Sequence, residues 1–257
     1  MKNFYSKNEI PKLTTSGLKL LGKLGVMDKE TWLKNFASGS RDWRLKQLRK
    51  LLSSYYLRSY PSPSINDVVA LGKQGVKLLE SHHTPFVTLP YPGQVDHDVT
   101  LSQILLAIHK SISVSDFSVE KELKSFGYDY NFMFTRDNDQ KFPDSIIEVN
   151  GDGRPLKLAI EYERNGKSLD RCEAIIKSYS CFDHIHFVLF IVENKMIMDR
   201  FLGLFRKKYY PDMEKKAGFV LVDKFLGDPL KYPIEMPSGV TSLARIEQNI
   251  LKFQSSA

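Results

Sequence analysis

Two apolar runs that flank a short turn constrain the fold of this chain more than any other feature. Residues 144–149 and 156–163 are rich in Ile, Val and Leu, and residues 150–155 between them have the sequence Asn-Gly-Asp-Gly-Arg-Pro. Asn, Asp, Gly and Pro are the residues that tight turns require. The pattern therefore predicts a β-hairpin in the middle of the chain.

Acidic residues stand at one end of this hairpin. Asp144 opens the first strand, and Glu161 and Glu163 close the second. Alternate residues of a strand share one face, so Glu161 and Glu163 point the same way and Tyr162 the other. Hard cations such as Mg²⁺ take oxygen ligands, usually one or two carboxylates with water and phosphate oxygens. We therefore expect Asp144, Glu161 and Glu163 to hold Mg²⁺ or Mn²⁺ against a phosphodiester, as in a nuclease.

The segments around the hairpin alternate between helices and strands. The expected helices cover residues 119–126, 168–179, 201–210 and 240–253, and the expected further strands cover residues 185–192 and 218–222. The strand at 185–192 is apolar throughout, which is typical of a strand buried inside a sheet. The order of these elements is a helix, a hairpin that carries acids, a second helix and a buried strand. Over about residues 95–225 this order resembles the core of the PD-(D/E)xK restriction-endonuclease fold. The expected class is α/β (α+β) with a mixed central sheet.

Basic charge is concentrated in the N-terminal third of the chain. Residues 1–80 contain 15 Lys and Arg against 6 Asp and Glu, a net charge of +9, whereas the whole chain has a net charge of +7. A basic module joined to a nearly neutral one is typical of a polyanion-binding domain attached to a second function. A solvated lysine-rich face without a partner is the alternative.

A basic helix follows two short helices in this third. Residues 16–24 and 28–36 have helical patterns, the second with Asp28 as its N-cap. Residues 40–52 then begin at a Ser cap and place leucines on one face, with Arg and Lys around the rest. This is the profile of a DNA-recognition helix.

Two short β-rich runs come directly after the basic helix. Residues 55–60 and 67–71 are separated by a Pro/Ser turn, which predicts the wing of a winged helix-turn-helix domain. The residues expected to contact DNA bases or phosphates are Arg41, Arg44, Lys46, Arg49, Lys50 and Arg58. A winged helix can also bind protein, which remains the alternative for this domain.

Turn residues at positions 81–93 separate the two halves. We expect a winged-helix DNA-binding domain at residues 1–84 and a PD-(D/E)xK-like nuclease domain at residues 94–257, beginning with a helix near Asp98. Two cysteines, Cys172 and Cys181, provide neither a disulfide framework nor a zinc site, which favours a reducing cytoplasm. The apolar runs are too short to cross a bilayer, so no membrane insertion is expected.

Three short motifs behind the winged helix resemble those of the replication-relaxation family, which includes the MobC-type plasmid relaxases. The motifs are Phe142-Pro143-Asp144, then Ala159-Ile160-Glu161-Tyr162-Glu163-Arg164, then Lys177-Ser178-Tyr179. The chain departs from the family pattern in two places. Phe142 precedes the Pro-Asp pair where arginine is frequent, and Lys177 lies two rather than three residues before Tyr179.

The resemblance implies a relaxase that binds the transfer origin of a mobilisable plasmid as double-stranded DNA and nicks one strand to start conjugation. A coupling protein and an accessory mobilisation protein are the implied partners. In the PD-(D/E)xK pattern the third position is lysine, but this chain has Glu163 there, so Lys177 on the following helix is the expected replacement. His97, Glu120 and Tyr179 resemble accessory polar positions of the family.

A different nickase chemistry is also represented in the sequence. His184-Ile185-His186 is a His-hydrophobe-His motif, and Tyr210 downstream is a possible nucleophile. Histidines would then bind the metal, and the tyrosine would attack phosphorus and leave a covalent 5′ link. Pro211 follows Tyr210 directly and disfavours the continuous tyrosine helix that this chemistry requires.

Two further functions remain open at this point. The chain could be a replication or transcription regulator that binds DNA through the winged helix and has a non-catalytic second domain. It could also be a restriction-like or repair nuclease, which needs two active sites to cut both strands and hence a dimer on a palindrome.

Overall fold

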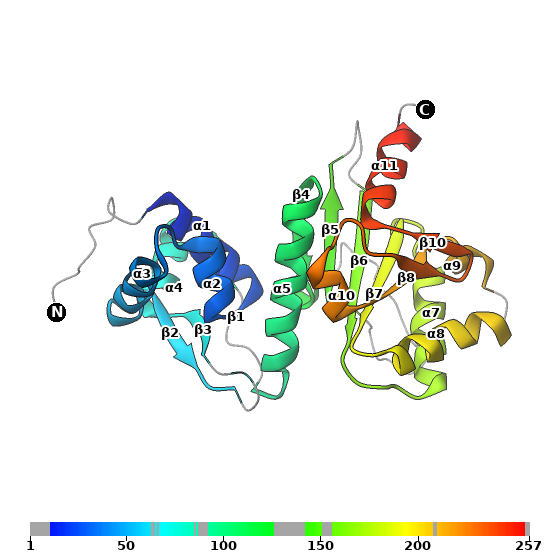
Figure 1. The fold of residues 1–257 in the computed structure, drawn as a ribbon, viewed down its shortest axis with the longest axis horizontal. Coiled ribbons are helices and arrows are strands. Elements are labelled where there is room, and N and C mark those ends of the chain that lie inside the picture. The colour runs from blue at the N-terminus through cyan, green and yellow to red at the C-terminus, as the bar shows by residue number, and fades with distance from the viewer. Residues whose placement is uncertain are drawn as a thin grey trace. The chain divides into compact units, whose positions relative to one another are not determined.

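The computed structural model describes residues 11–62, 65, 67–84, 86, 92–125, 142–150, 156–207 and 210–254. This part of the chain is a mixed α/β structure with eleven α-helices, a small antiparallel sheet and a seven-stranded mixed sheet (Figure 1). The expected mixed α/β class is confirmed. The chain divides into two compact units, Met1–Gln103 and Ile104–Ala257. The expected linker at residues 81–93 precedes this division, and residues 85 and 87–91 of it lie outside the described part.

The first unit combines helices with a three-stranded antiparallel sheet in the order β1-β3-β2. Its elements are α1 (Lys12–Leu24), β1 (Val26–Asp28), α2 (Lys29–Phe36), α3 (Arg41–Ser53), β2 (Leu57–Tyr60), β3 (Val68–Leu71), α4 (Lys73–Ser81) and the 3-10 turn η1 (Pro92–Gln94). Helix α5 (Val95–Ser111) follows, and the division between the units falls inside it.

Side-chain caps begin the two helices that precede the β2/β3 hairpin. Oδ1 of Asp28 accepts a hydrogen bond of 2.7 Å from the N–H of Thr31 at the start of α2. Oγ of Ser40 accepts a bond of 3.4 Å from the N–H of Trp43 at the start of α3. Both caps are as the sequence predicts, because a short polar side chain can satisfy an N–H that the first helical turn leaves free.

The core of the first unit brings the small sheet against helices. Val26, Val68 and Ala70 from the sheet form one buried cluster with Val95 and Val99 from the first turns of α5. The Nε2 amide of Gln103 donates a hydrogen bond of 2.9 Å to Oδ2 of Asp28, so the carboxylate that caps α2 also binds α5.

The second unit is built on the seven-stranded sheet, in the order β10-β9-β8-β7-β6-β5-β4. Its elements after α5 are β4 (Val114–Val119), α6 (Glu120–Ser125), β5 (Ser145–Val149), β6 (Leu156–Glu163), α7 (Leu169–Ser180), β7 (Phe187–Val192), α8 (Lys195–Lys207), α9 (Pro211–Glu214), β8 (Ala217–Leu221), α10 (Val222–Gly227), β9 (Ile234–Met236), β10 (Gly239–Thr241) and α11 (Leu243–Gln254). Strands β4, β5 and β6 form an antiparallel meander, and β6, β7 and β8 are parallel.

Helices α7 and α8 cover one face of this sheet (Figure 1). Ile146 of β5, Ala159 of β6 and Phe190 of β7 lie on that face, in one buried cluster with Tyr179 of α7 and Phe201 of α8. Because side chains alternate along a strand, Glu161 and Glu163 lie on the same face of β6 as Ala159. The acids of the predicted site are therefore on the helix-covered side of the sheet.

The hairpin of β5 and β6 is confirmed as an antiparallel pair, although residues 151–155 of its turn lie outside the described part. The expected helix at 168–179 and the expected strands at 185–192 and 218–222 correspond to α7, β7 and β8. The helix expected at 240–253 begins only at Leu243, because Gly239–Thr241 is strand β10. Among the described helices, none combines the length and the apolar character needed to cross a membrane.

Candidate functional site

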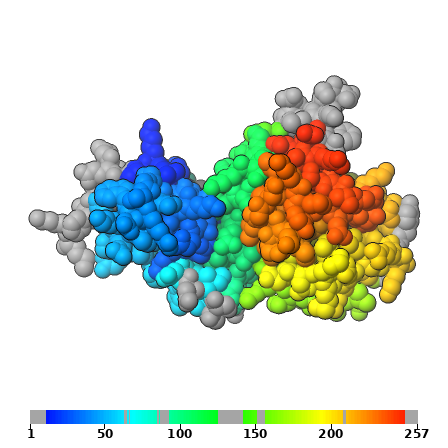
Figure 2. All heavy atoms as spheres, in the orientation of Figure 1, coloured from blue at the N-terminus to red at the C-terminus, as the bar shows by residue number. Residues whose placement is uncertain are grey.

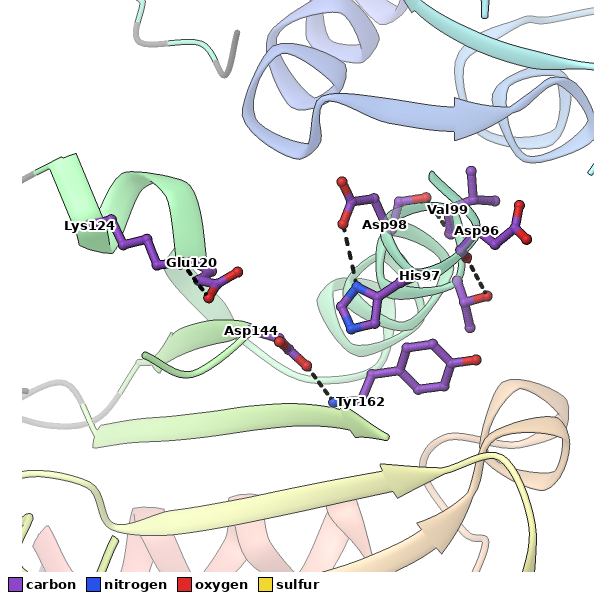
Figure 3. Close-up of polar contacts among 10 residues, drawn as sticks. Asp96, His97, Asp98, Val99, Glu120, Lys124, Asp144 and Tyr162 are labelled. Carbon is purple, nitrogen blue, oxygen red and sulfur yellow. Dashed lines mark hydrogen bonds and ion pairs between the residues drawn. The ribbon is translucent and has the colours of Figure 1, made fainter. Parts of the chain in front are cut away.

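Asp144 and Glu161 come together on neighbouring strands. Ser145 of β5 pairs with Ile160 of β6, so the same antiparallel register places Asp144, one residue before β5, beside Glu161. The N–H of Tyr162 lies beyond the last pairing of β5 and donates a hydrogen bond of 2.7 Å to Oδ2 of Asp144 (Figure 3). This bond fixes the carboxylate of Asp144 at the end of β6 that carries the two glutamates.

Glu120 belongs to the same group through the start of α6. Its backbone N–H donates a hydrogen bond of 2.9 Å to the carbonyl oxygen of Asp144, which ties the first turn of α6 to the start of β5. Its side-chain Oε1 lies 2.8 Å from Nζ of Lys124, one helical turn further on (Figure 3). Three acids from separate chain segments are thus held in one region of the second unit.

Tyr179 of α7 lies at the centre of this group. Its hydroxyl donates a hydrogen bond to Oε1 of Glu161, and both side chains are 1% exposed. Burial, and then the charges of Glu161, Asp144 and Glu120, raise the pKa of Tyr179 well above its ordinary value. The tyrosine is therefore protonated at neutral pH and can donate a hydrogen bond, and the charges of all three carboxylates act on its hydroxyl.

Glu163 has a different partner. Its Oε2 forms an ion pair with Nζ of Lys167, and its Oε1 is buried without a hydrogen-bond partner among the described residues. Nη1 of Arg200, on α8, donates to the carbonyl oxygen of Lys167 and so holds the segment that carries this lysine. A buried carboxylate is stabilised by such a cation, because an isolated charge is costly to bury.

Lys177, which we expected to replace the missing lysine of the PD-(D/E)xK pattern, is not brought to these acids. Its Nζ lies 2.8 Å from Oε1 of Glu173 on the outer face of α7, and 63% of its side chain is exposed. Residues two positions apart on a helix point in directions about 200° apart around its axis. Lys177 therefore faces away from the core when Tyr179 faces it. Lys167, by contrast, lies beside Glu163, one of the three predicted metal ligands.

The side chains around Asp144 have the oxygen donors that a hard cation prefers. The orphaned oxygen of Glu163 is a buried acceptor that a cation could satisfy. As the side chains lie, however, no group of three or more His, Cys, Asp or Glu within the described ranges is arranged to hold a metal ion. Asp144 accepts a hydrogen bond from Tyr162, and Glu161 accepts one from Tyr179. To bind a metal ion, each carboxylate would have to give up this bond or bind the ion through its remaining oxygen lone pairs.

The predicted DNA-binding residues divide into two groups on α3. Lys46, Arg49 and Lys50 are exposed. Arg41 is paired with Glu30 of α2 at 3.3 Å, and Nη1 of Arg44 donates to the carbonyl oxygen of Leu33 at 3.4 Å. The first three cations face solvent together, Arg41 is also exposed although it pairs with α2, and Arg44 is half-buried against α2.

Arg58 lies on β2, in the hairpin predicted as the wing. Its guanidinium lies over the ring of Tyr60, 5.3 Å from the ring centroid. Its Nε and Nη2 are buried and have no hydrogen-bond partner among the described residues. The stacked guanidinium is thus held by the aromatic ring rather than by an acid.

His97 lies in the first turns of α5, in the first unit. Its Nδ1 is 3.4 Å from Oδ1 of Asp98 (Figure 3). Oδ1 of the preceding Asp96 accepts a hydrogen bond of 2.6 Å from Oγ of Ser62. His97 is therefore a half-buried histidine that contacts the next residue of the same helix.

The histidines of the rival tyrosine chemistry precede β7. Nδ1 of His186 accepts a hydrogen bond of 3.0 Å from the N–H of Lys157, and burial lowers the pKa of His184 and of His186. Tyr210 ends the segment before α9, where Pro211 occupies the first helical position. The helix that would carry the nucleophile is thus interrupted at Tyr210, as its proline predicts.

Two contacts of the site were not expected from the sequence. The hydroxyl of Tyr162 donates a hydrogen bond of 2.7 Å to Oε2 of Glu193, which follows β7. Oε2 of Glu163 forms an ion pair with Nζ of Lys167, four residues further along the chain in the segment between β6 and α7.

Comparison of the chain with protein-family models, with curated proteins and with solved structures finds no match.

Proposed function

We propose that this protein is a metal-dependent DNA nickase of the relaxase type, which binds the double-stranded transfer origin of a mobilisable plasmid and cleaves one strand. The observation that carries the proposal is the group of Asp144, Glu161 and Glu120 around the buried hydroxyl of Tyr179. Glu161 is buried, and a buried acid close to two other acids is costly unless a function or a cation offsets their repulsion.

The order of elements supports the proposed fold of each unit. In the first unit a basic helix, α3, precedes the antiparallel β2/β3 hairpin, which is the arrangement of a winged helix with its wing. In the second unit the antiparallel meander β4-β5-β6 is followed by α7 and the parallel strand β7, as in the PD-(D/E)xK fold. Fold likeness alone does not carry the activity, so the acids remain the main support.

Each residue of the site has a role in this proposal. Asp144 and Glu161 would hold Mg²⁺ or Mn²⁺, with Glu120 or Glu163 as a third acid. A bound divalent ion would stabilise the charge that develops on the phosphate and lower the pKa of a water molecule. Tyr179 orients Glu161 through its hydroxyl, and the N–H of Tyr162 orients Asp144.

Lys167 takes the place of the lysine that the PD-(D/E)xK pattern has at position 163. It neutralises Oε2 of Glu163, and the free Oε1 of the same carboxylate is the acceptor for the proton of the attacking water. The water oxygen forms the new bond to phosphorus as the bond between phosphorus and the bridging oxygen breaks, and the bridging oxygen takes its proton from solvent. This role is assigned to Lys167 rather than Lys177, because Lys177 faces solvent beside Glu173.

The proposal is tested with supercoiled plasmid that carries a candidate transfer origin, incubated with Mg²⁺ or Mn²⁺ and with EDTA. Wild-type protein should convert supercoiled to open circular DNA only with the metal, and Asp144→Ala should not. Protease treatment before electrophoresis distinguishes free from protein-linked 5′ ends. Loss of cleavage in Tyr210→Phe, with protein on the 5′ end of the wild-type product, would replace the acid site by the tyrosine chemistry of His184 and His186.

A DNA-binding regulator with a non-catalytic second unit is the second candidate. The observation that favours it is that Asp144, Glu161 and Glu163 are each engaged in a protein contact, and no described group is arranged for a metal. Such a protein would bind duplex DNA without cleaving it under any metal condition. Under the nickase proposal, a coupling protein and an accessory mobilisation protein are the expected partners.

A further inference from the structure

The solvent face of α3 combines cations with one large aromatic side chain. Helix geometry places residues 43, 46, 49 and 50 on one arc of the surface, because positions three, four and seven apart are neighbours. Leu48 and Leu51 face the opposite way and are buried. The residues on the exposed arc are Trp43, Lys46, Arg49 and Lys50. Figure 2 shows this light-blue stretch of the chain at the surface of the first unit.

Trp43 is 56% exposed, whereas Trp32, the other tryptophan of the chain, is fully buried. Tryptophan is the residue with the largest area to gain from burial, so leaving it in water is costly. Packing in the core of the first unit therefore does not explain why a tryptophan stands at position 43.

The start of α3 holds the indole in a defined position. Gly39 has a positive φ of 92°, and a Cβ at Gly39 would lie 2.8 Å from Cδ1 of Trp43. The ring thus lies against the glycine backbone, where a side chain would displace it. An exposed indole that is packed against its own helix start is ordered before any ligand arrives, which lowers the entropy cost of binding.

We propose that Trp43 lies against base edges in the major groove of duplex DNA and contacts the C5 methyl group of thymine. This inference rests on the proposed function, since it needs the first unit to bind DNA. Lys46, Arg49 and Lys50 on the same arc provide the charge that DNA phosphates require. An apolar side chain at the groove edge distinguishes thymine by its methyl group, the one apolar substituent that the major groove presents.

The composition of the arc favours DNA over a protein partner. Lysine is depleted in the buried core of protein interfaces, because its charge must be desolvated there. Two of the three cations around Trp43 are lysines, and residues 1–80 have a net charge of +9 from 15 basic and 6 acidic residues. Duplex DNA, a polyanion that presents thymine methyl groups in the groove between its phosphates, fits this arc best.

The test uses a duplex selected by the full-length protein from a randomised pool, labelled with fluorescein for anisotropy. Binding of the same unlabelled duplex should quench the emission of Trp43, while the emission of the buried Trp32 stays constant as background. In Trp43→Phe the quenching should be lost. Replacing every thymine of the duplex by uracil should weaken binding by the wild type about fivefold. The affinity of Trp43→Ala should be the same for the thymine and the uracil duplex.

Leu13→Ala is the matched control, because Leu13 is another exposed apolar residue of the first unit, at 44% exposure. Its affinities for the thymine and uracil duplexes should equal those of the wild type. Equal affinity of the wild type for both duplexes with no quenching would overturn the inference while leaving DNA binding intact. Failure to enrich or bind any duplex would overturn the proposed function, and the inference with it.

Discussion

The hydroxyl of Tyr179 donates a hydrogen bond to Oε1 of Glu161 in the interior of the second unit. The tyrosine comes from helix α7 and the glutamate from strand β6, so the bond joins the helix layer to the strand that carries the acids. The charges of Asp144 and Glu120 act on the same hydroxyl. The protonated tyrosine thereby stabilises the buried carboxylate of Glu161, which lies in a region with two other acids.

Removing this hydroxyl should destabilise the protein measurably. Tyr179→Phe leaves the buried carboxylate of Glu161 without its donor, which should lower the free energy of unfolding by about 1.5–3 kcal/mol. Urea denaturation followed by circular dichroism measures the change. Tyr162→Phe is the control, since its hydroxyl binds the exposed Glu193 and its loss should cost about 1 kcal/mol or less. Equal costs for the two variants would contradict the central place of Tyr179.

Stability should decrease at alkaline pH because of the same residue. The folded state raises the pKa of Tyr179, so its stabilising contribution is fully present below the unfolded pKa, about 10, and is lost as pH rises towards the folded pKa. The difference in unfolding free energy between wild type and Tyr179→Phe should therefore shrink between pH 9 and pH 11. A difference that stays constant over this range would show that the hydroxyl has no raised pKa.

Lys167, and not Lys177, should matter for cleavage. Lys167→Ala removes the cation from the buried Glu163 and should reduce the nicking rate by at least about tenfold, within the range of general acid-base effects. Lys177→Ala removes a mostly exposed lysine whose partner is Glu173 rather than a predicted site acid, and it should nick at the wild-type rate. Lys167→Arg distinguishes the effect of the positive charge from that of the lysine side chain itself. It keeps the charge and should retain part of the nicking activity. If Lys177→Ala nicked more slowly than Lys167→Ala, Lys177 would be the catalytic lysine, as the sequence predicts.

The two cysteines should react at different rates. Cys181 is exposed at the end of α7, whereas Cys172 is buried and burial raises its pKa. A thiol reagent such as DTNB should therefore modify one thiol per chain in the native protein and two in urea. Cys181→Ser should abolish the fast reaction, and a fast reaction that persists in this variant would place Cys172 at the surface.

Local patterns in the sequence predicted the elements whose signals are short-range. Asp28 and Ser40 were recognised as caps because capping depends on side chains within three residues of the helix start. Strand β6 has the predicted bounds, Leu156–Glu163. The hairpin of β5 and β6, which brings Asp144 to Glu161, followed from the same reasoning.

The features that sequence reasoning missed depend on contacts between distant segments. Strands β1, β9 and β10 have three residues each, too few for an alternating pattern to be visible, and they are strands because a neighbour pairs with them. The position of Lys177 was readable in principle, because residues two apart on a helix face different ways. Lys167 gave no signal of its own, since its position depends on Arg200 holding its carbonyl oxygen.

The claim that Asp144 and Glu161 form a divalent metal site is tested most directly by counting bound Mn²⁺ with electron paramagnetic resonance. Free Mn²⁺ gives a six-line signal that binding removes, so a titration measures both affinity and stoichiometry. Wild type and Glu148→Gln, a control further along β5 where the acid pairs with Lys157, should bind Mn²⁺ alike. Asp144→Asn and Glu161→Gln, which keep the side-chain size, should each weaken binding at least about tenfold. Binding by both variants with wild-type affinity would contradict the account.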